Sequence, residues 1–374
     1  MIPIGMEVNN VHCAFSGKVT VNGGEIEIAS STALGSGTLA LEGAGVKLSL
    51  SGGSSLSNAV SLGTTGTSAV FDGAGIISGV ISGAGHLLKQ GDGKIELSGI
   101  NTYSGQTTIS GGILALNGTL TNSPVVVAAG GTLKGSGTVG GNLGISGVLA
   151  PGNSPGILTA GGTTNFASGS IFEWDLDTAA GNTRGVAYDA INTTAVTGSG
   201  ATFKIMLTGT QNFSDTYWQV SRVWTDIFKN ATGTADLENW AGTFSGFSYS
   251  YASGSTAAPV GFGSFSLSGN TLAWSAVPEP GNVLAGLLAG VLRLGLMATN
   301  IQGWLILSIA LHGPVFVLFY PTSQIYLEQR VDHRLRAQSQ ALLSLLNSGV
   351  GNLSGYLLIG WWHTACTSSQ GVVD

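Results

Sequence analysis

Glycine interrupts short runs of β-forming residues throughout the first 165 positions, and this spacing restricts the possible fold more than any other feature. In residues 97–116, LSGINTYSGQTTISGGILAL, glycine separates runs of Thr, Ile and Leu. The segment has too much glycine for a helix and too many β-branched residues for a flexible linker. Runs such as EIEIA and KIELS alternate apolar and polar residues, which is the period of a half-buried strand. The pattern therefore predicts short strands joined by tight turns.

The short strands recur at a loose interval. The phrase Gly-x-Leu begins at Gly37, Gly112, Gly131 and Gly156. The last three lie about twenty residues apart, a period typical of a β-solenoid whose coils stack around a narrow core. Glycine is then expected at the corners, where a positive φ excludes a Cβ atom, and Asn101 and Asn117 suit similar corners. A β-sandwich is the alternative, although sandwiches favour longer strands and less glycine.

Composition divides the chain into three regions. Residues 15–165 carry the glycine-spaced runs, residues 166–276 gain aromatic and acidic side chains, and the pattern becomes apolar and helical from Gly281 onward. Four tryptophans are expected to give the second region a larger core: Trp218, Trp224, Trp240 and Trp274. Charged residues are 9 % and hydrophobic residues 43 % of the chain, which argues against disorder. The net charge of −6 argues against nucleic-acid binding.

Residues 87–120, LLKQGDGKIELSGINTYSGQTTISGGILALNGTL, resemble the autotransporter-associated β-strand repeat. The matching positions are Lys89, Gly91, Gly93, Leu97, Ser98, Gly99, Asn101, Tyr103, Ser104, Gly105, Thr107, Ile109, Gly112 and Leu114, whereas Ile95 stands where Leu is usual. Residues 147–159, GVLAPGNSPGILT, resemble the segment that commonly follows such repeats. The resemblance implies an exported, right-handed parallel β-helix that serves as a passenger stalk or surface fibre.

Residues 277–297 resemble a PEP-CTERM sorting signal, in which Val-Pro-Glu-Pro precedes an apolar helix and basic residues. Val277, Pro278, Glu279 and Pro280 match, and Arg293 is the single basic residue that follows the apolar run. The resemblance implies cleavage by an exosortase-type protease. The first ten residues lack the basic start and apolar run of a secretion signal. We therefore expect either that the true start lies upstream or that the gene has lost its 5′ part.

Two apolar stretches, 301–320 and 341–362, contain no Asp, Glu, Lys or Arg and have the length of membrane spans. The region 301–362 resembles the late helices of nucleoside:proton symporters of the major-facilitator type, and it covers two of about twelve helices. The resemblance suggests transport roles for His312, Gln324, Tyr326 and Arg336. The chain is thus interpreted as an exported β-helix protein fused to a transporter fragment.

Two groups of charged residues are candidates for chemistry. The first comprises Asp72, Lys89, Asp92, Lys94 and Glu96. Lys94 and Glu96 are alternate residues of one strand, so a solvated face explains the group better than an active site. The second group is Glu173, Asp175 and Asp177, which share one strand face and can offer oxygen ligands to Ca²⁺. A solvent-facing acidic stripe is the favoured explanation. Gly181, Tyr188 and Asp189 follow, so a calcium site formed by the loop and the strand is the alternative.

The sequence therefore predicts an all-β chain: a right-handed parallel β-helix, then a β-rich region, then an apolar helical tail. The predicted function is non-enzymatic and structural or adhesive, at the cell surface or outside a bacterial cell, with no cofactor. The expected partners are the membrane, an envelope or extracellular polysaccharide, and the sorting protease. Nucleoside transport by the tail and a carbohydrate-active β-helix enzyme are the alternatives.

Overall fold

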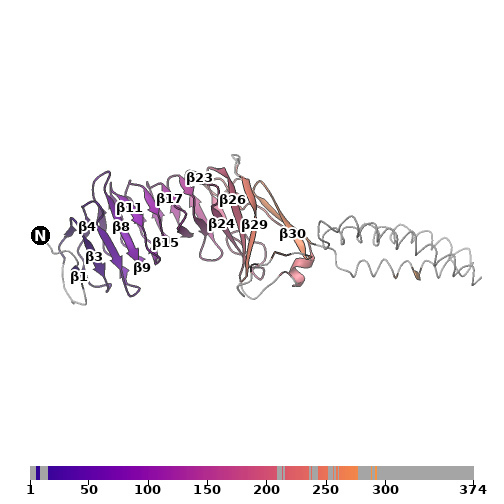
Figure 1. The fold of residues 1–374 in the computed structure, drawn as a ribbon, viewed down its shortest axis with the longest axis horizontal. Coiled ribbons are helices and arrows are strands. Elements are labelled where there is room, and N and C mark those ends of the chain that lie inside the picture. Colours follow the sequence, from indigo (N-terminus) through magenta and orange to yellow (C-terminus); the bar gives the residue numbers. More distant parts are fainter. Residues whose placement is uncertain are drawn as a thin grey trace, which may run out of the picture. The chain divides into compact units, whose positions relative to one another are not determined.

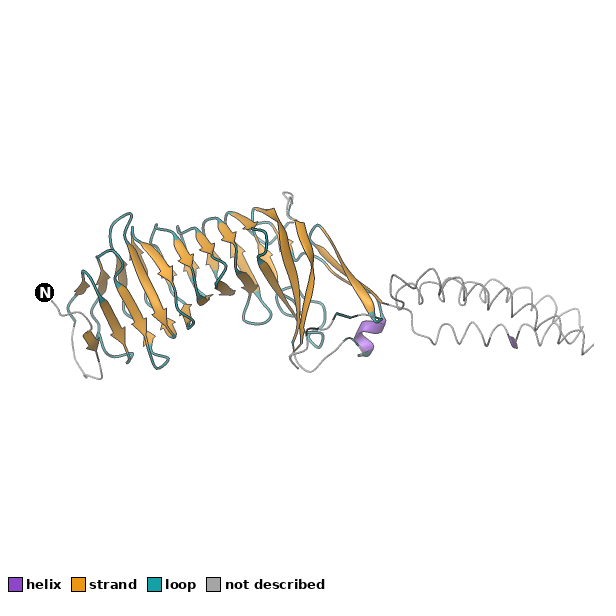
Figure 2. Ribbon diagram, in the orientation of Figure 1, coloured by secondary structure: helices purple, strands orange, loops and turns teal. Residues whose placement is uncertain are grey.

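The computed structural model describes residues 6–8, 16–208, 213, 215–235, 237, 243–251, 256, 258–259, 261–276, 288 and 291–292. The chain divides into two compact units. The first comprises residues 1–212, 222–258 and 265–273, and the second comprises residues 213–221, 259–264 and 274–374. The described residues of the first unit are almost entirely strands and turns (Figures 1 and 2).

Three ladders of parallel strands make up the first unit, and consecutive strands pass from one ladder to another. The first ladder contains β1 (Met6–Val8), β3 (Glu25–Ile28), β5 (Lys47–Leu50), β8 (Ser68–Gly73), β11 (His86–Lys89), β14 (Thr107–Ile109), β17 (Val125–Val127), β20 (Leu143–Ile145), β23 (Thr163–Phe166) and the start of β26 (Ala195–Leu207).

The second ladder contains β6 (Ser55–Leu56), β9 (Gly75–Ile77), β12 (Lys94–Leu97), β15 (Gly112–Leu116), β18 (Gly131–Gly135), β21 (Val148–Pro151), β24 (Ile171–Leu176), the end of β26 and β29 (Thr243–Tyr251). The third ladder is in two parts. One contains β2 (Val19–Val21), β4 (Leu39–Leu41), β7 (Val60–Leu62) and β10 (Ile81–Gly83). The other contains β13 (Ile100–Asn101), β16 (Thr119–Leu120), β19 (Thr138–Val139), β22 (Ile157–Ala160), β25 (Ala190–Asn192) and β28 (Phe228–Lys229).

The parallel solenoid predicted from the glycine spacing is confirmed. Residues about twenty positions apart face each other on neighbouring coils, as in Leu87 with Thr107 and Thr107 with Val125. Gly112 and Leu114 pair with Gly131 and Leu133, so two of the Gly-x-Leu phrases stack. The phrase at Gly156 does not stack on them, because Ile157 begins β22 on the third ladder. The hand of the coil stays a prediction.

Alternating burial explains how these short strands form one core. In most strands every second side chain is buried, for example Ile95 and Leu97 in β12. The inward residues of successive coils stack in columns, so Leu114, Leu133 and Leu149 follow one another on the second ladder. Each strand is too short to be stable by itself. Burial against the coils on either side supplies the missing apolar contact.

The coils become longer after β23, with 32 residues from Thr164 to its partner Val196 against 21 from Leu143 to Thr164, and aromatic side chains take over the core. Phe172 continues the leucine column, and it pairs with Phe203, which pairs with Phe247. Phe172 also contacts Phe166 and Phe228, with ring centroids 5.9 and 5.4 Å away. Of the tryptophans expected to enlarge the core of residues 166–276, Trp218, Trp224 and Trp274 are buried. Trp240 lies outside the described residues.

These tryptophans belong to different units. Trp224 is in the first unit, where it contacts Trp174 at 5.5 Å. In the second unit Trp274 contacts Phe213 and Trp218 at 5.2 and 5.1 Å, and its indole N–H donates to the Trp218 carbonyl at 2.8 Å. The remaining elements are a 3₁₀ helix (Thr216–Gln219) and a sheet of β27 (Arg222–Trp224), β31 (Thr271–Ala276) and β30 (Gly263–Ser268).

Within the residues that the structure describes, no helix has both the length and the apolar character needed to cross a membrane. The predicted spans at 301–320 and 341–362 lie outside those residues. The helical tail therefore stays a prediction from the sequence.

Candidate functional site

The repeat coil of residues 87–116 is the most specific sequence signal, and its glycines are required by stacking. A Cβ atom on Gly105 would lie 2.1 Å from the carbonyl oxygen of Gly85 on the coil before it. A Cβ on Gly99 would lie 2.7 Å from the oxygen of Gly79. Of the repeat-motif glycines Gly99, Gly105 and Gly112, only Gly112 has a positive φ, +60°. The expectation that these corners need positive φ is thus wrong for Gly99 and Gly105, where close approach of backbones excludes a side chain.

The corner asparagines connect neighbouring turns through their side-chain amides, and neither has the left-handed backbone for which Asn suits a corner. Asn101 is 1 % exposed, and its Oδ1 accepts the backbone N–H of Ile81 at 3.0 Å, while its Nδ2 donates to the Gly99 carbonyl at 3.1 Å. Asn117 Oδ1 accepts from the Ser136 N–H at 3.3 Å and from Asn153 Nδ2 at 3.0 Å. Each amide satisfies backbone groups that a corner leaves without a ladder partner.

Tyr103 and Thr107 form a polar chain inside the coil. Both are fully buried, and the Tyr103 hydroxyl bonds to Thr107 Oγ1. Thr107 Oγ1 is also 2.8 Å from Ser123 Oγ on the next coil. Burial raises the pKa of Tyr103 to about 12. The neighbouring repeat residue Ser104 is exposed, and its backbone N–H bonds to the Gly83 carbonyl at 3.0 Å. The repeat polar groups therefore serve coil packing.

Lys89 is a buried structural cation, which fits its place in the repeat motif and separates it from the solvated face of Lys94 and Glu96. Its side chain is 0 % exposed, and Nζ donates to the carbonyls of Gln90 at 2.7 Å, Gly91 at 3.0 Å and Gly111 at 3.4 Å. Desolvation lowers its pKa. Alternation from the buried Leu87 would have placed Lys89 inward, and this signal was available in the sequence.

The other members of the first charged group are half-buried or exposed. Lys94 and Glu96 share the outer face of β12 and form an ion pair of 3.4 Å, as the solvated-face interpretation predicts. Asp72 pairs with Lys47 at 2.9 Å. Burial acts to raise the pKa of Asp72, but hydrogen bonds from Lys47 and the Gly73 N–H outweigh it and lower the pKa. Asp92 is exposed.

The three carboxylates of β24 and its end have separate partners. Glu173 pairs with Lys204, its neighbour in register on β26, at 2.7 Å. Asp175 is only 8 % exposed, so the solvent-facing stripe is wrong for this residue. Burial raises its pKa, opposed by a hydrogen bond with Ser154. Asp177 Oδ1 accepts the N–H of Ala179 at 2.9 Å in a local turn. The described residues contain no group of three or more His, Cys, Asp or Glu side chains placed to hold a metal.

Asp189, which the sequence offers as part of a loop-and-strand calcium site, is the most buried carboxylate among the described residues. It is 0 % exposed. Its Oδ1 accepts the Gly156 N–H at 2.7 Å and its Oδ2 accepts the Asp175 N–H at 3.0 Å. Burial, and then the charge of Asp175, raise its pKa well above the usual range. Asp189 thereby ties the 152–156 turn to β24.

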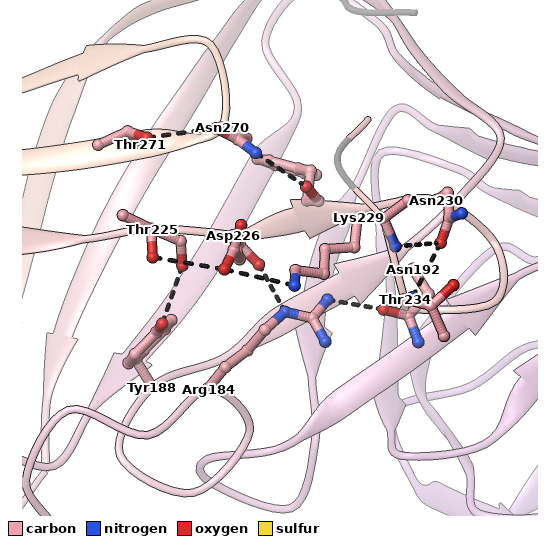
Figure 3. A network of polar contacts seen from close by, with 12 residues as sticks. Arg184, Tyr188, Asn192, Thr225, Asp226, Lys229, Asn230, Thr234, Asn270 and Thr271 are labelled. Carbon is pink, nitrogen blue, oxygen red and sulfur yellow. Dashed lines mark hydrogen bonds and ion pairs between the residues drawn. The ribbon is translucent and has the colours of Figure 1, made fainter. Parts of the chain in front are cut away.

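Figure 3 shows a second polar network, which connects the loop before β25 to later segments. Arg184 Nη2 donates to Asn192 Oδ1 at 2.7 Å and to the Ile191 carbonyl at 3.0 Å. Arg184 Nε donates to the carbonyl of Asp226, whose carboxylate pairs with Lys229 at 3.4 Å. The Tyr188 hydroxyl donates to the Thr225 carbonyl at 2.8 Å. Because Arg184 donates its hydrogen bonds to backbone and amide oxygens, the network holds loops in place.

Other predicted site residues lie outside the described residues. They are the sorting-signal positions Val277, Pro278, Glu279, Pro280 and Arg293 and the transport candidates His312, Gln324, Tyr326 and Arg336.

Comparison with known proteins matches two parts of the chain. The family model described as "Passenger-associated-transport-repeat" matches residues 87–116, the coil from β11 to β15. The model "Nucleoside H+ symporter" matches residues 281–374. The first match supports the repeat recognised in the sequence.

Two relatives share part of the chain. An "Extracellular serine protease" of Serratia marcescens is 39 % identical over 97 residues, which are 26 % of this chain and 9 % of that protein. An "Adhesin BmaC autotransporter" of Brucella suis biovar 1 (strain 1330) is 35 % identical over 109 residues, which are 29 % of this chain and 3 % of that protein. The chain thus spans less than a tenth of the length of these curated relatives.

Proposed function

We propose that this chain belongs to a bacterial protein exported to the cell surface or beyond, where its β-helix is a non-enzymatic structural or adhesive stalk. The main support for the proposal is the use of the repeat-motif polar groups. In the coil matched by the passenger repeat, Lys89, Asn101, Tyr103 and Thr107 all bond within the solenoid. A coil whose repeat-motif polar groups serve stacking can be repeated to any length, which suits an extended stalk.

The relatives support export. One is named as an extracellular protease and the other as an autotransporter adhesin. The protease name raises the enzyme alternative. His86 is the single histidine among the described residues, and its Nδ1 accepts the Gln106 N–H at 2.8 Å. This nitrogen is thus used in joining two coils, which favours the adhesive role.

Brief protease treatment of intact producing cells tests export. We expect peptides from residues 16–208 to be released from intact cells, while a cytoplasmic marker stays inside. Protection of these peptides until the cells are lysed would contradict the proposal. Deletion of residues 87–116 should also reduce attachment of the cells to a surface, whereas loss of a hydrolytic activity would favour the enzyme alternative.

The proposal extends to membrane attachment through a sorting segment. The Val277–Pro280 motif and the apolar run after it are taken as a sorting segment for an exosortase-type protease. Mass spectrometry of the mature protein tests this, since cleavage would place its C-terminus close to residue 280. A mature chain that extends through residue 374 would show that the segment is not processed.

Nucleoside transport is the second candidate function, favoured by the symporter match over residues 281–374. Uptake of labelled uridine by cells producing the chain measures it directly. Since two predicted spans cannot form both halves of an alternating-access path, we expect no uptake above that of control cells.

A further inference from the structure

Gly144 differs from the stacking glycines of the solenoid. It lies at the centre of β20 on the first ladder, with the outward parity of its strand. A Cβ atom added there would meet its nearest neighbours, Val126 Cγ2 and the Val125 oxygen, at 3.9 and 4.0 Å. These are ordinary van der Waals distances, and the φ of Gly144 is not positive. The fold therefore does not require glycine at this position.

Gly144 is one of the residues that line a hollow of about 360 Å³ on the outer face of the first ladder. Gly144 stands between Val126 and Asn165 in one outward column, while Asn142 stands between Pro124 and Thr163 in the next. The hollow thus extends over four successive coils, from β14 through β17 and β20 to β23, two of which are labelled in Figure 1.

The lining is uncharged. Residues 97–172 contain a single charged residue, Lys134, and Lys134 lies in β18 on the second ladder. The same first ladder carries charges at its other end, where Lys47 pairs with Glu25 at 3.2 Å and with Asp72 at 2.9 Å. A charged ligand would find no ion-pair partner in the hollow, so an uncharged ligand fits it better.

The lining offers hydrogen bonds together with a small apolar floor. Gln106, Asn142 and Asn165 are exposed. Asn142 Oδ1 accepts the Thr163 N–H at 3.0 Å and Asn165 Nδ2 donates to Thr197 Oγ1 at 2.8 Å, which leaves the Asn142 amide N–H groups and the Asn165 carbonyl to face a ligand. Val126 and Pro124 supply apolar surface beside them. Backbone groups of β20 are paired with strands on both sides, so an added peptide strand has no unpaired ladder edge to join at this face. Hydroxyl groups above C–H surface, as in a sugar ring, match this lining.

We propose that the hollow around Gly144 binds an uncharged linear polysaccharide, which runs along the solenoid from coil to coil. Neighbouring coils are about 4.8 Å apart, close to the length of one sugar residue, so successive sugars meet successive coils. The inference deepens the proposed adhesive function, on which it rests for its biological setting.

Isothermal titration calorimetry of the full chain in mild detergent tests the site, with cellohexaose, maltohexaose and mannohexaose as probes. At least one should bind, and Gly144→Val should weaken that binding about tenfold or more by filling the hollow, a loss of about 1.4 kcal/mol. Asn165→Ala should weaken it less. Thr119→Val, an outward substitution on the third ladder, is the matched control and should leave the affinity unchanged.

Absence of binding by all three neutral hexasaccharides at about 5 mM would overturn the inference. An unchanged affinity in Gly144→Val would overturn it too. So would tighter binding of hexagalacturonate or of a short uncharged peptide than of the neutral hexasaccharides. The circular dichroism spectrum and hydrogen exchange of Gly144→Val establish that it is folded. The titration uses purified protein and does not depend on export. A negative result of protease treatment of intact cells would therefore contradict only the proposed function, and an absence of hexasaccharide binding would contradict only this inference.

Discussion

The narrow coils of residues 86–166 and the wide coils of residues 171–251 share the same ladders but fill their cores differently. In the narrow coils the interior is filled mainly by Leu, Ile and Val, two to a strand in β12, β17 and β20, and glycines such as Gly105 let backbones approach. In the wide coils, Phe172, Trp174 and Phe203 are all buried, and the Phe203 ring contacts both of the others.

The difference shows what sets coil width in a solenoid. Narrow coils are limited by backbone contact, so a single added methyl group is costly. In the wide coils, large buried rings fill the core, so a lost ring is costly. Dense packing is required in both cases, but it is achieved by the smallest residue in one region and the largest in the other.

Truncation of Trp174 is expected to have the largest effect. Its ring is 0 % exposed and contacts Tyr188 and Trp224 at 5.7 and 5.5 Å, and its N–H donates to the Asp189 carbonyl at 2.8 Å. Trp174→Ala should lower the free energy of unfolding by about 3–5 kcal/mol. Urea unfolding followed by circular dichroism measures it, with Trp174→Phe as the milder control. A loss close to that of a surface substitution would mean that aromatic filling does not stabilise the wide coils.

Addition of one methyl group at Gly105 is the corresponding change in a narrow coil. Since the new Cβ would lie 2.1 Å from the Gly85 oxygen, the two coils must separate. Gly105→Ala should cost about 3 kcal/mol, and hydrogen exchange should rise in peptides from both coils. Gly144→Ala, where space exists, is the control and should change stability by less than about 0.5 kcal/mol. Equal effects of the two substitutions would contradict the stacking explanation.

Removal of the Lys89 ammonium tests the polar groups of the narrow coil. Lys89→Met keeps the apolar stem but leaves three carbonyls, those of Gln90, Gly91 and Gly111, without this donor. The expected loss is about 2 kcal/mol in urea unfolding. Lys94→Met removes an exposed ion pair and should cost less than about 1 kcal/mol. If Lys94→Met were the more harmful, Lys89 would not be the structural cation.

A lower pH should change the local stability of the two ends of the solenoid in opposite directions. This is the smallest of the four predicted effects. Asp175 and Asp189 have raised pKa values, mainly from burial. Their contribution to stability is therefore greatest below the unfolded pKa of about 3.9 and is lost as the pH rises through their folded values. Glu25 has a lowered pKa, first because of its bond from Ser49, so its contribution is lost as the pH falls.

Hydrogen exchange at pH 7 and pH 4.5, corrected for the intrinsic rate, measures the contrast. Protection of residues 171–192 should increase at the lower pH relative to residues 25–50. Asp189→Asn should reduce that increase, because it removes the more perturbed carboxyl. An increase that persists unchanged in this variant would assign the effect to other groups.

Local pattern was sufficient to predict the narrow coils. Glycine spacing and apolar alternation led to the parallel solenoid, and the repeat motif located the coil of residues 87–116. Alternation also predicts that Lys89 points inward, because Leu87 and Lys89 lie on the same face of their strand. It does not place Asp189, whose partners Gly156 and Asp175 lie on other segments.

The sequence by itself determined that this chain coils, because strand period and turn residues are local properties. The tertiary structure decided which coil positions stack: Gly156 leaves the Gly-x-Leu column, Phe172 replaces leucine where the coil widens, and Gly144 faces a hollow. The physical reason is register. A residue's neighbours on the next coil depend on the length of every turn between them, and one residue more or less moves each side chain to another partner.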